Sequence, residues 1–247
     1  MGLGSKYGII ASTGNNIQTL GLVTYWDAAY KKSYTTGSLN TFNLASGSLT
    51  PTGSLKNDTG FSNDNQGSWV FDGVDDYINC GQITELEGAT TFTISGWFNQ
   101  TTIDQQRFMW GAFVSTINMI TAYTWTDGHM YFDFRNGASS YVGFDYSTLV
   151  TAGEWFHCAC VFDGAGATKP DKFKIYIDGA LASVTSIGTA TFPTTSNATQ
   201  GDFLIGDNSN WDKEWLGNIA NVKVYNKALS VGDILQNYNA QKNRFGL

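Results

Sequence analysis

The sequence contains few cysteines, prolines, histidines and basic residues. Among its 247 residues, three are Cys, three are Pro and two are His, and 14 Lys and Arg stand against 21 Asp and Glu. An odd number of cysteines in no framework spacing argues against a disulfide scaffold. We expect Cys158 and Cys160, two apart on one strand face, to pack as small apolar residues. The formal net charge of −7 argues against nucleic-acid binding, which requires a basic face.

Long apolar runs are also missing. No stretch of about 18 apolar residues is present, so no membrane-spanning helix is predicted. Residues 1–7 contain no apolar run of the kind found in a secretory signal. We therefore expect a protein that is made in a reducing cytoplasm without export and that has no membrane partner.

Aromatic residues and glycines, by contrast, are abundant. Phe, Trp and Tyr make up 15% of the chain, 28 residues are Gly, and only 14% of the residues are charged. The polar balance is made up by Asn, Ser, Thr and Gln. This composition predicts many tight turns and a neutral polar surface suited to contacts with sugars or with other protein subunits.

Apolar and polar residues alternate in short segments from Thr91 onward. Phe92, Ile94 and Phe98 fall on one face of a strand, and Trp97 falls on the other. Further strands are predicted at residues 21–29, 107–113, 119–125, 130–135, 141–146, 155–162, 172–177, 180–186, 203–205 and 218–225. Strands at this spacing, with Gly-rich turns and no alternation with helices, predict an all-β antiparallel sandwich of two sheets.

The chain is organised around residues 68–81. Two short apolar segments flank the turn dipeptide Asp72-Gly73, which predicts a β-hairpin that later strands cover. Residues 33–66 are predicted to be a long irregular segment with one or two short strands. Residues 1–20 are predicted to form an N-terminal arm, held either by the domain or by a neighbouring subunit, and residues 21–247 one domain.

One helix is predicted near the end of the chain. Ser230 is a good N-cap, and Asp233 stands three residues later in the position of a capping box. Leu229 and Ile234 have the spacing of a hydrophobic staple. We expect a short helix that packs over an edge or end of a sheet.

Several motifs resemble one superfamily. FDGVDDYINCG at residues 71–81 resembles the signature of laminin-G-like and concanavalin A-like jelly rolls, in the branch common in bacterial surface proteins and tailed-phage virion proteins. Further segments resemble strands and the tail of the same branch: 21–29, 92–98, 154–157, 174–179, 222–230, 238–240 and 244–246. The resemblance covers roughly residues 20–247 and implies a two-sheet jelly roll. It implies little about activity, because one sandwich fold serves many functions.

Catalytic motifs are absent from the sequence. The resemblance implies that a glucanase on this fold would carry a Glu-x-Asp-x-(x)-Glu strand, which this chain lacks. Its only close Glu pair, Glu85 and Glu87, is expected in a solvated loop. His157 is expected to be a packed, hydrogen-bonded residue in mid-strand, and His129 an exposed turn residue. We therefore expect no enzymatic activity, with an endoglycanase as the remote alternative.

Carbohydrate binding is a sharper hypothesis. Sugars stack their apolar faces on Trp or Tyr and pair their hydroxyls with Asn and Asp. The predicted rim loop 206–215 has this composition, and Trp97 could line an exposed sheet face together with Trp110 and Trp125. The candidate glycan-binding residues are Trp97, Asp207, Asn208, Asn210, Trp211 and Trp215. Alternatively, these aromatic residues belong to the core or to a subunit interface.

A calcium site is a third possibility. Many laminin-G-like domains carry Ca²⁺, and Asp72, Asp75 and Asp76 could supply the oxygen ligands that this ion prefers. Relatives often have an Asp just before the closing strand, where this chain has Ala220-Asn221. The three Asp residues can equally well be turn residues only.

The resemblance and the missing motifs together favour a non-enzymatic virion structural protein of a tailed phage. Such a protein would decorate the head or form part of the tail or a fibre, and it would reside in the virion. Its partners would be capsid or tail subunits and further copies of itself, and a host-surface glycan is a further candidate partner. The alternative is a lectin domain of a soluble or cell-surface protein.

Overall fold

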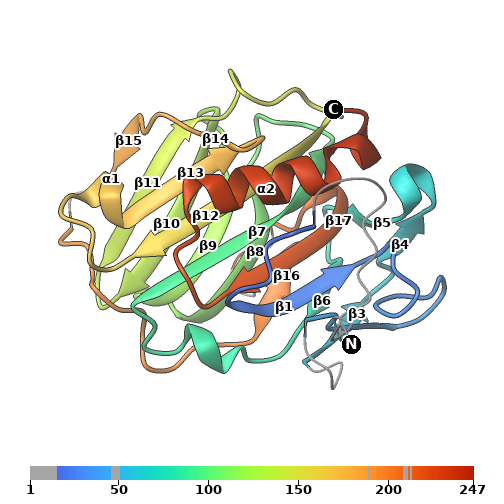
Figure 1. Ribbon diagram of the computed structural model, residues 1–247, viewed down its shortest axis with the longest axis horizontal. Helices are drawn as coiled ribbons and strands as arrows, with labels where there is room; N and C mark the ends of the chain where they lie inside the picture. The colour runs from blue at the N-terminus through green and yellow to red at the C-terminus, as the bar shows by residue number, and fades with distance from the viewer. Residues whose placement is uncertain (1–15, 46–50, 189, 208–210, 212) are drawn as a thin grey trace, which may run out of the picture.

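Two antiparallel sheets face each other in the computed structural model, which describes residues 16–45, 51–188, 190–207, 211 and 213–247 (Figure 1). The sheet that lies under the C-terminal helix is called here the helix-side sheet, and its partner the opposite sheet. The predicted all-β sandwich is thereby confirmed.

Within the described residues the helix-side sheet runs in the order β14-β13-β12-β7-β17-β5-β4, and β1 also pairs with β17. Its strands are β1 (Leu22–Asp27), β4 (Gly60–Ser62), β5 (Ser68–Asp72), β7 (Thr91–Gln100), β12 (Trp155–Asp163), β13 (Phe173–Ile177), β14 (Ala180–Leu181) and β17 (Leu216–Tyr225).

The opposite sheet runs in the order β15-β11-β10-β9-β8-β16-β6-β3-β2 over the same described ranges. Its strands are β2 (Asn40–Phe42), β3 (Thr52–Lys56), β6 (Tyr77–Asn79), β8 (Arg107–Ser115), β9 (Asn118–Thr124), β10 (His129–Asn136), β11 (Ser139–Asp145), β15 (Ser186–Ile187) and β16 (Phe203–Ile205).

The core fills the space between the two sheets. Phe92 of β7 packs against Phe132 and Phe134 of β10, with both pairs of ring centroids 6.1 Å apart. All three side chains are fully buried, and each such burial contributes about 1.5–3 kcal/mol. Cys158 and Cys160 are buried free thiols in the same core, as the sequence predicted.

Helix α2 (Val231–Gln241) crosses the outer face of the helix-side sheet (Figure 1). Its Ser230 cap and Asp233 form the predicted capping box. The 3-10 turn η3 (Lys242–Phe245) follows it and continues the cover. The predicted helix is therefore confirmed, but it lies on the outer face of the sheet, where Tyr238 stacks on Trp97 of β7, and not over an edge or end as predicted. Among the described residues no helix has the length and apolar character needed to cross a membrane.

The predicted hairpin at residues 68–81 is wrong. Strand β5 pairs with β17 and β4 in the helix-side sheet, whereas β6 pairs with β16 and β3 in the opposite sheet. The connection between them therefore crosses from one sheet to the other. Asp76 accepts a hydrogen bond from the Asp72 N–H at 3.0 Å, which closes this corner. Phe71 and Ile78 thus enter one core from opposite sides.

Short helical turns occupy three described segments for which no helix was predicted. They are η1 (Asp64–Gln66), η2 (Thr84–Leu86) and α1 (Lys169–Lys172). Leu86 anchors η2 to the core, because its side chain is 1% exposed and belongs to the main hydrophobic cluster.

The predicted N-terminal arm lies largely outside the described residues. Where it is described, Gln18 donates from Nε2 to Asp233 at 2.6 Å and from its backbone N–H to Asn237 at 2.7 Å. Residues 16–20 of the arm are therefore held by the domain's own helix α2.

A buried polar cluster joins the end of the chain to β1. Asp27 is fully buried and accepts hydrogen bonds from Arg244 Nη1 at 2.9 and 3.0 Å and from the Tyr25 hydroxyl at 2.6 Å. Lys223 is also fully buried and donates to Asn221 at 2.5 Å and to Gln241 at 2.7 Å. Burial lowers the pKa of Lys223 to about 7, despite the nearby charge of Asp27.

His157 differs in one respect from the sequence-based expectation. It is packed in mid-strand as expected, against Trp97 and Tyr238. However, neither of its ring nitrogens has a hydrogen-bond partner. Burial lowers the pKa of His157 to about 3, and the charge of Lys223 contributes to this shift. The imidazole is therefore neutral and packs as an aromatic ring.

Candidate functional site

A row of aromatic rings crosses the outer face of the opposite sheet. Along β10, Met130, Phe132 and Phe134 point into the core, so the alternate residue Tyr131 points outward. Tyr131 lies 5.5 Å from Tyr123 of β9, and Tyr123 lies 5.2 Å from Phe108 of β8, between ring centroids. The row therefore spans three adjacent strands.

Trp211 extends this row from a loop. Its indole stacks on Phe108 with a centroid distance of 5.7 Å and an interplanar angle of 9°. Because Phe108 is fully buried and Trp211 is half-buried, Trp211 covers the end of the row and keeps part of its own ring exposed.

A cleft of about 200 Å³ opens among these rings. We call it the aromatic cleft, and its lining residues are Gln106, Phe108, Met119, Tyr123, Trp125, Asp133, Arg135 and Trp211. Trp125 is 38% exposed and meets Tyr123 edge-on at 6.0 Å. The cleft thus offers two partly exposed indoles and a small number of polar groups.

The charged groups of the aromatic cleft neutralise each other. The Asp133 side chain is only 1% exposed, and it accepts hydrogen bonds from Arg135 Nη2 at 2.6 Å and from Nε at 3.1 Å. Burial raises the pKa of Asp133, and the hydrogen bonds from Arg135 act against this rise. Arg135 Nη1 also donates to the Thr116 carbonyl at 2.8 Å.

The structure brings only part of the predicted glycan-binding set to the surface. Trp211 lies in the aromatic cleft together with Trp125, the residue predicted to line an exposed sheet face with Trp97. Asn208 and Asn210 lie outside the described residues.

The prediction is wrong for the remaining described candidates for glycan binding, because their side chains are buried. Trp97 does lie on the face opposite Phe92, but that face is covered, because the Trp97 ring stacks on Phe245 at 4.1 Å and on Tyr238 at 5.7 Å. Trp215 is fully buried against Phe98, and Asp207 is 6% exposed. Trp110 is 1% exposed in the core. These side chains are not accessible to a glycan.

The three predicted metal ligands lie together. Each of Asp72, Asp75 and Asp76 offers one carboxylate oxygen, and these oxygens lie within 4.8 Å of one another. Asp72 and Asp75 are exposed and Asp76 is 3% exposed. Burial raises the pKa of Asp76, the Asp72 N–H lowers it, and the charges of Asp72, Asp75 and Asp58 raise it further.

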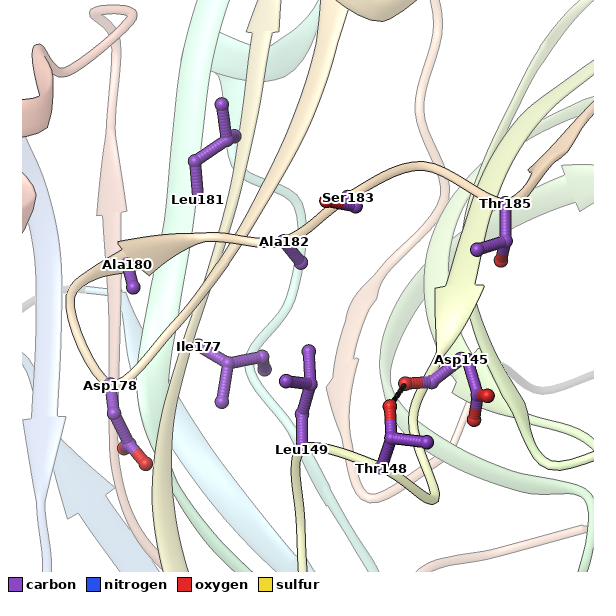
Figure 2. Close-up of a pocket in the computed structure, with 10 residues that line it drawn as sticks. All are labelled: Asp145, Thr148, Leu149, Ile177, Asp178, Ala180, Leu181, Ala182, Ser183 and Thr185. Carbon is purple, nitrogen blue, oxygen red and sulfur yellow. Dashed lines mark hydrogen bonds between the residues drawn. The ribbon is translucent and has the colours of Figure 1, made fainter.

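A second, larger cavity of about 450 Å³ lies beside the β13–β14 hairpin (Figure 2). Figure 2 shows Leu149 and Ile177 between the two carboxylic acids that line it, Asp145 and Asp178. Its lining residues include no aromatic side chain. This cavity therefore lacks the stacking surface that the aromatic cleft provides.

The sequence matches one family model over residues 72–235, which is more than half of the chain. That model is described as the concanavalin A-like lectin/glucanases superfamily. The chain belongs to this superfamily. No curated protein is similar enough to the chain to count as a match.

Several solved structures have a similar fold. The receptor binding domain of botulinum neurotoxin C/D mosaic serotype is 14% identical, with a TM-score of 0.64 over 90% of this chain and 51% of the other. A sialidase of Trypanosoma rangeli is 13% identical, with a TM-score of 0.62 over 91% of this chain and 33% of the other.

Domain 4 of AbnA, an extracellular GH43 arabinanase from Geobacillus stearothermophilus solved with arabinotriose, is also similar. It is 17% identical, with a TM-score of 0.56 over 89% of this chain and 98% of that domain. The chain thus spans about half of the neurotoxin structure and a third of the sialidase, and nearly the whole arabinanase domain. At these identities the likeness concerns the fold alone.

Proposed function

We propose that this chain is a non-catalytic carbohydrate-binding module that holds a sugar in the aromatic cleft. The observation that carries this proposal is the cleft itself, in which two partly exposed indoles, Trp125 and Trp211, accompany polar groups on one sheet face. Aromatic faces stack on the apolar face of a sugar ring, and a few placed polar groups fix its orientation.

The polar groups of the aromatic cleft suit hydroxyl recognition. Gln106 can both donate and accept, and Arg135 carries five N–H donors, of which Asp133 and Thr116 use only part. The fold relatives support the proposal, because the arabinanase domain was solved with arabinotriose and the neurotoxin domain is a receptor binding domain.

The absence of catalysis is supported by the carboxylates of the cleft. Hydrolysis of a glycosidic bond usually needs two carboxyl groups about 5–9.5 Å apart. Asp133 is the single carboxylate that lines the described cleft, and it is held in an ion pair with Arg135. We propose on this basis that the sugar is bound and released unchanged.

The test of this function is a glycan array followed by titration of the best ligand. Trp125→Ala and Trp211→Ala each remove a stacking surface and are expected to weaken binding about tenfold or more. Phe42→Ala is the matched control, because Phe42 is 37% exposed and belongs to β2, away from the cleft. Binding that is unchanged by both Trp substitutions would rule out the cleft as the site.

The setting in which the module works is a finer proposal. We propose a structural component of a tailed-phage virion, as head decoration, tail or fibre, that contacts other virion subunits and host-surface glycan. This proposal is supported by the resemblance of residues 71–81 to that branch and by the low share of charged residues, 14%. A lectin domain of a soluble or cell-surface protein is the alternative.

Light scattering and binding to purified virion proteins separate these two settings. A virion component is expected to self-associate or to bind capsid or tail subunits. A chain that stays monomeric and binds none of them, yet binds glycan, would favour the lectin.

We also propose that Asp72, Asp75 and Asp76 hold Ca²⁺. The residues fit this ion, because Oδ1 of the buried Asp76 has no hydrogen-bond partner and the three carboxylates converge. A hard cation with oxygen ligands would satisfy that atom and offset the mutual repulsion. Excess Ca²⁺ is expected to raise the melting temperature relative to EDTA in the wild type but not in Asp76→Asn. Equal melting temperatures of the wild type in both buffers would disprove the site.

A further inference from the structure

We infer that the aromatic cleft selects an uncharged sugar and receives a single ring of it, excluding sugars that carry a carboxylate. This inference rests on the proposed carbohydrate-binding function and names the ligand class of the same site. It follows from the charge balance of the cleft, from its surroundings and from its size.

The charges of the described lining residues balance. Among them are one cation, Arg135, and one anion, Asp133, which are joined by hydrogen bonds of 2.6 and 3.1 Å. A sugar carboxylate would have to share Arg135 with the Asp133 carboxylate, and two like charges would then lie close together with one cation between them. A hydroxyl meets no such repulsion and can still use the remaining N–H groups of Arg135.

The position of Asp133 makes this arrangement difficult to change. Its side chain is 1% exposed, whereas that of Arg135 is 21% exposed. Because a buried carboxylate without its partner is strongly unfavourable, Arg135 cannot turn away from Asp133 to meet an anionic ligand without a large cost.

Charged residues flank the cleft on two sides. Exposed Lys213 adjoins Phe108, whose N–H donates to the Lys213 carbonyl at 2.9 Å, and a second carboxylate lies on the side of Tyr131. Asp127 lies in the β9–β10 turn beside Trp125, and its Oδ2 accepts a hydrogen bond from the Tyr131 hydroxyl at 2.8 Å. Its side chain is 43% exposed. An anion that extended from the cleft along Tyr123 and Tyr131 would approach this carboxylate. The net charge of −7 of the whole chain acts in the same direction.

The size of the cleft limits what enters it. Pockets for drug-sized ligands measure about 300–1,000 Å³, and the aromatic cleft measures about 200 Å³. Phe108 and Met119 close its floor, since both are 1% exposed or less. The cleft therefore receives one sugar ring, and the rest of a glycan chain remains in solvent.

The test compares neutral and acidic sugars of the same shape on the full chain. The probes are methyl glycosides of glucose, galactose, mannose and arabinose, the uronic acids of the three hexoses, and an N-acetylneuraminic acid glycoside, each titrated by calorimetry or NMR. At least one neutral sugar is expected to bind about tenfold or more tightly than every acidic sugar, because a sugar carboxylate in this site must share Arg135 with the Asp133 carboxylate.

The outcomes separate this inference from the function on which it rests. An acidic sugar that binds as tightly as the best neutral one, with Trp125→Ala weakening both, would overturn the neutral preference and leave the carbohydrate-binding function standing. Failure of every sugar to bind would overturn the function, and the inference with it.

A charge variant tests the cause of the selectivity. Asp133→Asn keeps the shape of the side chain and leaves Arg135 without its counter-charge. The ratio of acidic to neutral dissociation constants is expected to fall about tenfold. An unchanged ratio in a folded variant would show that the Asp133–Arg135 pair does not set the preference.

Salt dependence of the wild type gives an independent readout if the variant does not fold. Acidic-sugar binding is expected to tighten between about 0.05 and 0.5 M NaCl, because salt screens the repulsion between the sugar carboxylate and Asp133 and Asp127, whereas neutral-sugar binding is expected to stay the same. Acidic-sugar binding that weakened over this range would show net attraction and contradict the inference.

Discussion

The buried ion pair between Arg244 and Asp27 is predicted to contribute strongly to the stability of the fold. Arg244 reaches across the end of the sandwich and donates to both carboxylate oxygens of Asp27, at 2.9 and 3.0 Å. It also donates to the backbone carbonyls of Asn65 and Gly67, each at 2.6 Å. The Asp27 side chain is fully buried and that of Arg244 is 8% exposed. Arg244→Met would keep the aliphatic length and remove the charge.

The expected loss of stability is large because one charge would remain buried without a partner. Breaking a buried pair in this way typically costs about 3–5 kcal/mol. For a chain of this size each kcal/mol corresponds to about 2–4 °C in melting temperature, so the variant is expected to melt roughly 10 °C below the wild type. An exposed ion pair contributes far less, about 0–1 kcal/mol.

Thermal unfolding followed by circular dichroism measures this loss. Lys227→Gln is the matched control, because it breaks the pair with Asp233, whose atoms lie 3.6 Å apart and whose lysine is 41% exposed. Hydrogen exchange of residues 231–245 provides a local readout, since Arg244→Met is expected to loosen η3 first. If Arg244→Met melted within about 2 °C of the control, the assignment of a stabilising buried pair would be refuted.

Three further substitutions test other parts of the structure. The pKa of Lys223 is about 7 in the folded chain and near 10.5 in the unfolded chain, so between these pH values only the unfolded chain holds the proton. Stability is therefore expected to rise with pH in this window. Denaturant titrations of Lys223→Met are expected to lack this rise. Gly96→Ala would place a Cβ 2.4 Å from the Asn221 carbonyl, and a loss of about 1–3 kcal/mol is expected by denaturant titration. Gly232→Ala in the first turn of α2 would place a Cβ no closer than 3.7 Å to its nearest neighbour, Ser230 Oγ. It is expected to raise the free energy of unfolding by about 0.5–1 kcal/mol, seen as a higher melting temperature.

Local rules were enough to predict most of the strands and the C-terminal helix. The alternation of Phe92, Ile94 and Phe98 with Trp97 placed these residues on the correct faces of β7, because side-chain direction in a strand depends on the backbone alone. The Ser230 cap with Asp233 is likewise a local device, and it appears in the structure as predicted.

Partners distant in sequence could not be predicted in the same way. Trp97 was placed on an outer face, but its cover comes from Phe245, nearly 150 positions later along the chain. The turn at Asp72-Gly73 has ordinary hairpin composition, and only the distant partners of β5 and β6 assign these strands to different sheets.

The aromatic cleft illustrates the same limit. Tyr123, Trp125, Asp133 and Arg135 all occupy alternate, outward positions of β9, β10 and the turn between them, a signal that was present in the sequence. Phe108 has no such signal, because it lies next to a bulge in β8 that shifts the register between Phe108 and Trp110. The loop that brings Trp211 over Phe108 could not be positioned from its composition.

The place of β17 in the helix-side sheet has a consequence for how the protein is made. Residues 216–219 pair with β5, residues 221–225 pair with β1, and the whole strand lies against β7. During translation β1, β5 and β7 therefore leave the ribosome long before the strand that joins them. This sheet can close only after synthesis has passed residue 225, and such long-range pairing makes folding slow. The nascent chain must keep its aromatic segments from aggregating until then.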